Sequence, residues 1–173
     1  MTTMRKLPIG IQSFENIRNE NYLYVDKTAL IYQLVTKGKP YFLSRPRRFG
    51  KSLLISTLEA YFQGKKELFK GLAIDQLEQD WNVYPVLHLD LNARKYESEA
   101  DLVAILNQYL EMWEADYGDE MKLRAPEERF FYVIRRAWEQ TGRQVVVLID
   151  EYDKPLLLSL IHISEPTRHS LIS

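Results

Sequence analysis

The sequence has no cysteine, almost no net charge and no long apolar run. Without cysteine the chain can form neither disulfides nor thiolate metal sites, which fits a reducing compartment. Lys and Arg number 23 against 24 Asp and Glu, so a net charge of -1 provides no overall basic field for nucleic acid. No stretch approaches the roughly 18 apolar residues of a membrane helix, and the N-terminal residues MTTMRKLPIG lack a signal-peptide core. We therefore expect a cytoplasmic protein with no membrane partner.

The remaining composition is that of one folded domain in which strands and helices alternate. Hydrophobic residues make up 46% of the 173 positions, enough for a packed core. Apolar runs predict strands at residues 22–25, 41–43, 85–91 and 145–149. Helical spacing predicts helices at about residues 28–38, 53–64, 99–116 and 127–141. This order predicts an α/β domain.

Three of these segments carry more specific expectations about burial. The continuous apolar run VVVLI at residues 145–149 is typical of a parallel strand that is buried on both faces. The alternate leucines of residues 85–91 share one face of their strand. Along the last helix, Phe130, Phe131 and Trp138 are interpreted as core residues at helical spacing, with no functional role.

Residues 42–52, FLSRPRRFGKS, end like a phosphate-binding loop, a Walker A motif, but depart from its full pattern. In such a loop, backbone N–H groups and the positive end of the next helix hold the anion, while lysine reaches the β and γ phosphates. The order strand, loop, GKS and helix is intact, but Arg45 replaces the first glycine and Pro46 removes an N–H donor. We therefore predict a modified grip on the phosphates by Lys51, with Ser52 on Mg²⁺.

Two acidic residues follow the buried run directly, in the position of a Walker B motif. Asp150 and Glu151 come at the carboxyl end of the predicted strand, where α/β proteins bind ligands. An aspartate there holds magnesium through its water shell, and an adjacent glutamate polarises the attacking water. Taken alone, the pair is equally explained as polar strand-end residues or a helix cap. Together with Lys51 and Ser52, it predicts ATP binding and Mg-dependent hydrolysis.

Four segments together carry a resemblance to a known family: GIQSF (residues 10–14), YVDKT (24–28), RPRRFGKSL (45–53) and LIDEYDKP (148–155). Over about residues 7–157 the chain resembles the bacterial AAA-ATPase-like family, P-loop ATPases that are often fused to a restriction-endonuclease-like nuclease domain. In that family RPRRFGKS is the usual form of the loop. The resemblance implies a P-loop NTPase-like parallel sheet flanked by helices, with ATP and Mg²⁺ as cofactors. Nucleic acid is implied as a partner only through a C-terminal domain that this chain lacks.

The predicted nucleotide contacts are Arg47, Arg48, Phe49, Gly50, Lys51, Ser52 and Leu53, with Ser52 and Asp150 on the metal and Lys51 and Glu151 as catalytic residues. The two guanidinium groups suit bidentate phosphate contact, although a solvated basic turn explains them nearly as well. Asp26 either caps the next helix or, with Lys27, lies near the adenine as similar segments do in related ATPases. Capping is the favoured interpretation. Asp90 either faces the magnesium region or is an ordinary polar strand end.

Residues 158–173 break the pattern and resemble the translated read-through of a sequencing adapter joined to a truncated gene. We therefore expect residues 1–157 to be the N-terminal part of the ATPase domain, which makes its sheet incomplete; a native C-terminal strand and tail is the alternative. His162 and His169 lie in this tail and are assigned no ligand role, and His88 is interpreted as structural. The isolated chain is then at best a weak nucleotide binder, and the full-length parent is the ATPase.

Two other functions stay open at this point. Arg45, Arg47 and Arg48 would serve a nucleic-acid-binding module without turnover, whose affinity falls steeply with salt. A nucleotide-responsive scaffold would bind ATP without hydrolysing it.

Overall fold

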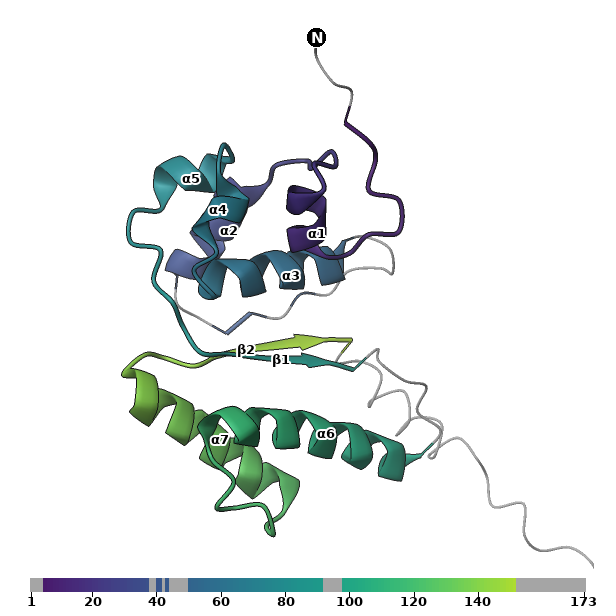
Figure 1. Ribbon diagram of the computed structural model, residues 1–173, viewed down its shortest axis with the longest axis vertical. Helices are drawn as coiled ribbons and strands as arrows, with labels where there is room; N and C mark the ends of the chain where they lie inside the picture. Colours follow the sequence, from purple (N-terminus) through teal and green to yellow (C-terminus); the bar gives the residue numbers. More distant parts are fainter. Residues whose placement is uncertain (1–4, 38–39, 42, 44–49, 92–97, 152–173) are drawn as a thin grey trace, which may run out of the picture. The chain divides into compact units, whose positions relative to one another are not determined.

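The computed structural model describes residues 5–37, 40–41, 43, 50–91 and 98–151 (Figure 1). The elements are α1 (Phe14–Asn19), α2 (Thr28–Thr36), α3 (Lys51–Phe62), α4 (Lys66–Phe69), α5 (Ala73–Leu77), β1 (Val86–Asp90), α6 (Glu99–Tyr117), α7 (Pro126–Thr141) and β2 (Val146–Asp150). The chain divides into two compact units, Met1–Val86 with Gln144–Leu148 and Leu87–Arg143 with Ile149–Ser173. Helices and strands are therefore mixed, as predicted for an α/β chain.

The two strands pair in parallel, and the boundary between the units falls within both of them. At the start of the pair, the Val146 N–H donates to the Pro85 carbonyl (2.9 Å). At its end, the Leu91 N–H donates to the Asp150 carbonyl (3.2 Å). Because both residue numbers rise together along the pair, the strands run in the same direction. This confirms the predicted strands at residues 85–91 and 145–149 to within one residue at most ends.

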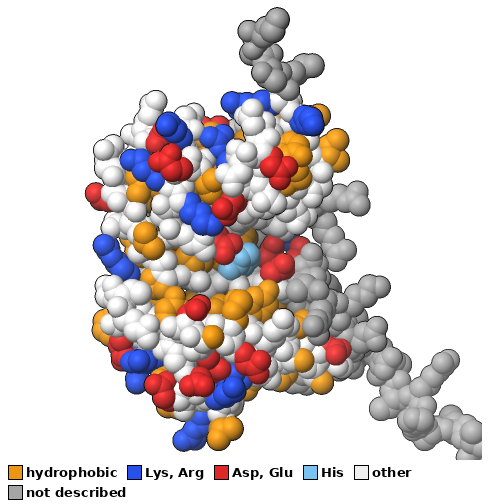
Figure 2. Space-filling model, in the orientation of Figure 1, with side chains coloured by type: hydrophobic (Ala, Val, Ile, Leu, Met, Phe, Trp, Pro, Cys, Tyr) orange, Lys and Arg blue, Asp and Glu red, His pale blue; other side chains and the backbone are white. Residues whose placement is uncertain are grey.

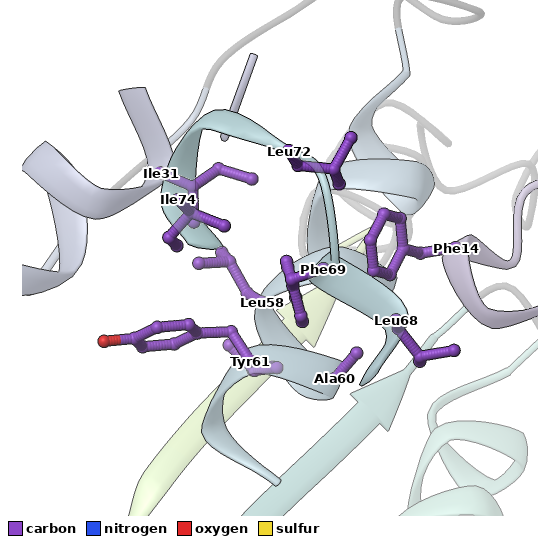
Figure 3. Packing of buried hydrophobic residues seen from close by; sticks show 10 residues of the cluster. Phe14, Ile31, Leu58, Ala60, Tyr61, Leu68, Phe69, Leu72 and Ile74 are labelled. Carbon is purple, nitrogen blue, oxygen red and sulfur yellow. The ribbon is translucent and has the colours of Figure 1, made fainter. Parts of the chain in front are cut away.

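The hydrophobic core of the first unit is built around α3 (Figure 3). Phe14 of α1 and Phe69 of α4 are fully buried, and their ring centroids lie 4.8 Å apart. Apolar residues from α2, α5 and β2 complete the cluster, whose members are Phe14, Ile31, Leu58, Ala60, Tyr61, Leu68, Phe69, Leu72, Ile74 and Leu148. Since every helix of this unit contributes to one cluster, burial of apolar surface fixes the position of α3.

In the second unit, α6 packs against α7, and both helices begin and end as their sequences dictate (Figure 1). α6 starts with a capping box, in which the Ser98 hydroxyl accepts the Asp101 N–H (3.3 Å) and the Asp101 carboxylate accepts the Ser98 N–H (3.0 Å). α7 starts at Pro126, whose fixed φ suits the first helical position. It ends at Gly142, with a φ of +63°, as predicted.

A buried ion pair joins α6 to α7. The Arg129 guanidinium donates from Nε and Nη2 to the two carboxylate oxygens of Glu114, at 2.7 Å each, and from Nη1 to the Asn107 side-chain oxygen at 2.7 Å. The side chains of Arg129 and Glu114 are only 6% and 2% exposed. The hydrogen bonds to Glu114, opposed in part by desolvation, raise the pKa of Arg129, so the guanidinium is held in its charged form.

The predicted burial of residues 145–149 on both faces is wrong for one of the faces. Val147 and Ile149 are 38% and 42% exposed, whereas Leu148 is buried in the first unit's core. Successive side chains of a strand point to opposite faces, so the alternation means that one face of β2 is covered and the other is partly open. A continuous apolar run could not distinguish these two situations.

One smaller strand prediction also differs from the structure, and another lies partly outside the described residues. Residues 22–25 form no strand; the Leu23 N–H donates to the Lys6 carbonyl (2.8 Å), and no strand ladder develops there. The segment at 41–43 includes Phe42, which lies outside the described residues. A strand needs a partner along its length, and local alternation does not supply one.

The interpretation of the α7 aromatic residues as core is wrong for two of the three. Phe131 is 71% exposed and Trp138 is 55% exposed, while Phe130 packs on Trp113 with 5.9 Å between ring centroids. The buried face of α7 is instead formed by Arg129, Val133 and Ala137. At 100° per residue, positions 131 and 138 lie about 160° and about 140° from the middle of that face. The helical register therefore places Arg129 on the buried face and leaves Phe131 and Trp138 off it.

Candidate functional site

The N-terminal end of α3 is the described part of the predicted phosphate loop. Gly50 is the N-cap, in the left-handed conformation (φ +74°, ψ 26°), and α3 begins at Lys51. The first hydrogen bond of the helix runs from the Leu54 N–H to the Gly50 carbonyl (3.0 Å). Helix geometry leaves the amides of the preceding turn, including those of Ser52 and Leu53, without acceptors inside the helix. Such an end attracts anions.

Glycine at position 50 is explained by the backbone rather than by space. A Cβ built there would meet no atom within 4 Å, so nothing crowds the position. A φ of +74° is, however, strained for any residue with a Cβ. The glycine therefore lets the chain turn sharply into α3.

Leu53, a predicted nucleotide contact, is also part of the packing of the first unit. Its side chain packs against the hydrophobic cluster of the first unit, and its carbonyl accepts the Thr57 hydroxyl (2.7 Å). Only its backbone N–H is therefore suited to a phosphate. Arg47, Arg48 and Phe49, together with Arg45, lie outside the described residues, and their roles stay predictions.

The acidic pair stands at the carboxyl end of β2, as predicted from the sequence. Asp150 is the last residue of the strand and is 6% exposed, and its carboxylate accepts the Glu151 N–H (2.9 Å). Glu151 has a φ of +57°, which is rare for a residue with a side chain. Backbone strain of this kind is often found at functional sites, because it directs the chain and its side chains to positions that regular structure does not reach.

The predicted site residues are divided between the two units. Lys51 and Ser52 belong to the first unit, and Asp150 and Glu151 belong to the second. Their convergence around one triphosphate stays a prediction.

Asp90, the other acidic candidate, ends β1 in the second unit. Its backbone is tied to α6, since its N–H donates to the Tyr109 hydroxyl and its carbonyl accepts from the same hydroxyl, at 3.3 Å each. Both bonds are made by the backbone and fix the end of the strand, so the two alternatives for the Asp90 carboxylate stay predictions.

Asp26 holds two helices together, which supports the capping interpretation of this residue. One carboxylate oxygen accepts the Thr28 N–H (2.8 Å) and the Thr28 hydroxyl (2.7 Å), and the other accepts the Ala73 N–H (2.7 Å). The Thr28 oxygen in turn accepts the Ile74 N–H (3.1 Å), so the start of α2 is joined to the start of α5. Although partial desolvation raises it, these donors keep the pKa of Asp26 below its ordinary value.

Two hollows lie elsewhere in the described part of the chain. One, of about 390 Å³, is lined by Glu111, Glu114, Ala115, Gly118, Asp119 and Lys122. The other, of about 200 Å³, lies between α1 and α3 and is lined by Ser13, Glu15, Ser56, Glu59, Ala60, Gln63 and Lys65. Neither contains a residue predicted to bind nucleotide.

Sequence reasoning missed the way in which the N-terminal segment contacts α3. The Phe14 N–H donates to the Ser56 hydroxyl oxygen (2.9 Å), and the ring of Tyr24 packs on that of Phe14 at 5.1 Å between centroids. Ser56 stands four residues after Ser52, and this spacing was the available signal that both side chains share one helical face.

Two general properties limit what else the described residues hold. Among them, no cluster of three or more His, Asp or Glu side chains is placed to bind a metal ion by itself. None of the helices in the described ranges is long and apolar enough to cross a bilayer. On the face shown in Figure 2, basic and acidic side chains are interspersed, in keeping with the net charge of -1.

Comparison with known proteins identifies relatives of the chain. A family model described as "Predicted AAA-ATPase" matches residues 8–171. A protein of Azotobacter chroococcum mcd 1, described as "Uncharacterized protein in vnfD 5'region", is 44% identical over 158 residues, which is 90% of this chain and 30% of the relative. The chain thus spans about 30% of the length of that curated relative. No solved structure matches the chain.

Proposed function

Since the chain belongs to this AAA-ATPase-like family, we propose that it binds ATP together with Mg²⁺ and that the full-length parent protein hydrolyses ATP. The observation that carries the proposal is the start of α3, where a left-handed glycine leads directly into Lys51 and Ser52. A family relationship alone would suggest the activity in general terms, whereas this helix end suggests where the phosphates bind.

The phosphate-binding part of the proposal rests on the first turn of α3. The helix is twelve residues long, so its dipole is well developed and its positive end is at Lys51. The amides of Ser52 and Leu53 would donate to phosphate oxygens, and the Lys51 ammonium would add a full positive charge. Arg47, Arg48 and Phe49 are proposed to complete the loop around the phosphates.

Magnesium would be held by the hydroxyl of Ser52 and the carboxylate of Asp150. Both are hard oxygen ligands of the type that Mg²⁺ prefers, and the burial of Asp150 limits competition from bulk water. When bound, the ion would neutralise charge that develops on the phosphates during transfer. Glu151, directly after Asp150, is proposed to orient and deprotonate the attacking water.

The binding step is tested with a fluorescent ATP analogue and the variant Lys51→Ala. We expect the affinity in the presence of Mg²⁺ to fall at least about tenfold, because the variant removes the charge that faces the phosphates. Lys66→Ala is the matched control, since Lys66 is an exposed lysine of the same unit, on α4. Equal affinities of Lys51→Ala and the unaltered chain would remove the basis of the proposal.

The metal and hydrolysis steps need separate variants. Asp150→Asn should abolish the gain in nucleotide affinity that Mg²⁺ produces, while leaving Mg-free binding nearly unchanged. Glu151→Gln, introduced into the full-length protein, should retain ATP binding and lose steady-state phosphate release. Retained phosphate release in Glu151→Gln would reject the proposed base, and ATP binding without any release in the unaltered protein would favour a nucleotide-responsive scaffold.

The nucleic-acid alternative is separated from ATP binding by its dependence on salt. Binding through Arg45, Arg47 and Arg48 to a phosphate backbone should weaken steeply between about 50 and 200 mM salt. ATP binding should instead depend mainly on Mg²⁺ and Lys51.

A further inference from the structure

We propose that Ser56 is a positioning residue for the nucleotide site: by anchoring α3 to α1, it holds the helix end that carries Lys51 and Ser52. The consequence for nucleotide affinity rests on the proposed function, whereas the consequence for the order of α3 does not. The contact lies on α3 itself, about one helical turn after Ser52.

The contact satisfies a backbone donor that α1 cannot satisfy itself. Phe14 is the first residue of α1, and helix geometry gives its N–H no acceptor within the helix. The Ser13 side chain accepts the Asn16 N–H (3.2 Å) instead. Because Phe14 is fully buried, an unpaired N–H would be costly, and the Ser56 hydroxyl oxygen accepts it at 2.9 Å. This hydrogen bond fixes α1 and α3 in one register.

Aromatic packing holds Phe14 of α1 inside the cluster to which α3 also contributes. The Phe14 ring lies 4.8 Å from that of Phe69 and 5.1 Å from that of Tyr24, and Figure 3 shows it directed toward Phe69 inside the cluster. The buried Thr57, next to Ser56, donates its hydroxyl to the Leu53 carbonyl (2.7 Å). The hydrogen bond from Phe14 therefore reaches the middle of α3, next to a side chain that bonds back to the preceding turn of the same helix.

The helical register connects Ser56 to the nucleotide site. Ser52 and Ser56 are four residues apart, so their side chains lie one above the other on the same face of α3. The side chain at position 52 leans toward the start of the helix, because Cα–Cβ bonds tilt toward the N-terminus. A rotation of α3 about its axis would move both hydroxyls together. The bond to Phe14 therefore limits the directions in which the proposed Mg²⁺ ligand can point.

A purely structural role for Ser56 is the competing explanation, and Thr28 provides a matched control. Thr28 is another hydroxyl residue of the first unit, fully buried where Ser56 is half-buried, and its oxygen accepts the Ile74 N–H near the start of α5 (3.1 Å). Ser56→Ala leaves the Phe14 N–H without its acceptor. Thr28→Val does the same to the Ile74 N–H and also removes the hydroxyl that donates to Asp26, so it is the more disruptive change of the two. Both variants should lower the melting temperature, but only Ser56→Ala removes the hydrogen bond between α1 and α3.

The first measurement is hydrogen exchange of the Leu54 amide, which reports the first hydrogen bond of α3 to Gly50 and needs no nucleotide. We expect its protection to fall about tenfold in Ser56→Ala relative to Thr28→Val, compared at equal global stability, and to return in Ser56→Thr, which restores the hydroxyl. Equal protection of Leu54 in Ser56→Ala and Thr28→Val would overturn the proposal.

The second measurement is the affinity for a fluorescent ATP analogue with and without Mg²⁺, well below the melting temperature of each variant. Ser56→Ala should weaken Mg-dependent binding about fivefold while Thr28→Val leaves it unchanged. If Ser56→Ala lowers the melting temperature but leaves the affinity unchanged, Ser56 has only a structural role and its proposed link to the nucleotide site is overturned. If Leu54 responds as expected but Lys51→Ala binds as tightly as the unaltered chain, the positioning of α3 stands and the proposed function fails.

Discussion

Replacing Arg129 by alanine leaves the carboxylate of Glu114 buried without its counter-charge. The pair is 6% and 2% exposed, and two hydrogen bonds of 2.7 Å connect Arg129 to Glu114, with a third of 2.7 Å to Asn107. Breaking a buried pair by removing one partner costs about 3–5 kcal/mol, because the remaining charge stays out of water. For a chain of this size that corresponds to a fall in melting temperature of roughly 6–20 °C.

Replacing both partners tests whether the cost comes from desolvation. In the double variant Arg129→Met with Glu114→Leu no charge is left buried, so the free energy of unfolding should return to within about 1–2 kcal/mol of the original value. The two single variants would then sum to far more than the double variant, which is the signature of direct coupling.

Urea unfolding followed by tryptophan fluorescence measures these differences, since Trp113 is buried beside Phe130 in the same unit. Arg135→Ala is the control. Its ion pair with Glu139, at 3.2 Å, is exposed and should contribute no more than about 0.5 kcal/mol. If Arg129→Ala lowers the free energy of unfolding by less than about 1 kcal/mol, the buried pair contributes no more than an exposed pair and the reasoning is refuted.

Three further outcomes are expected. Gly50→Ala should cost about 1 kcal/mol in thermal unfolding, because a φ of +74° strains any residue with a Cβ although no atom lies within 4 Å of the added carbon; unchanged stability would show that the turn relaxes. Asp26 has a folded pKa below its ordinary value of 3.8, so it contributes stability that is present above that pH and lost as the pH falls through the folded pKa. Asp26→Asn should remove this acid dependence from melting curves recorded between about pH 5 and pH 2, and an identical curve in the variant would assign the dependence to other groups. Trp138→Arg should change the free energy of unfolding by less than about 0.5 kcal/mol, because the side chain is mostly exposed. A large decrease in the free energy of unfolding, measured with urea, would mean that Trp138 belongs to the core after all.

The elements with strong local signals were predicted well. The strands β1 (Val86–Asp90) and β2 (Val146–Asp150) and the helices α6 and α7 all lie within one residue of their predicted bounds. Their signals are local, since helical spacing, a first-turn proline and a terminal glycine act within a few residues of each other. The short helices α1, α4 and α5 were not predicted, because a helix of four to six residues has too few positions to show a period.

Burial was predicted less well than secondary structure, because it depends on which other element covers each face. Arg129 carries a charge and yet lies in the core of the second unit, since Glu114 and Asn107 on α6 satisfy it. Phe131 and Trp138 point away from that core despite their apolar rings. Helical spacing identifies which residues share a face, but it does not say which face is buried.

The candidate site shows the same division between local and tertiary information. Local sequence was enough to place Lys51 and Ser52 at the start of a helix and Asp150 at the end of a strand, because glycine, helical spacing and β-branched runs act on their own neighbourhood. Tertiary structure decided that Ser56 receives the Phe14 N–H and that Asp26 joins α2 to α5. These contacts connect residues 42 and 47 positions apart, and such pairing arises only when the folded core brings distant backbone donors to the side chains that can accept them.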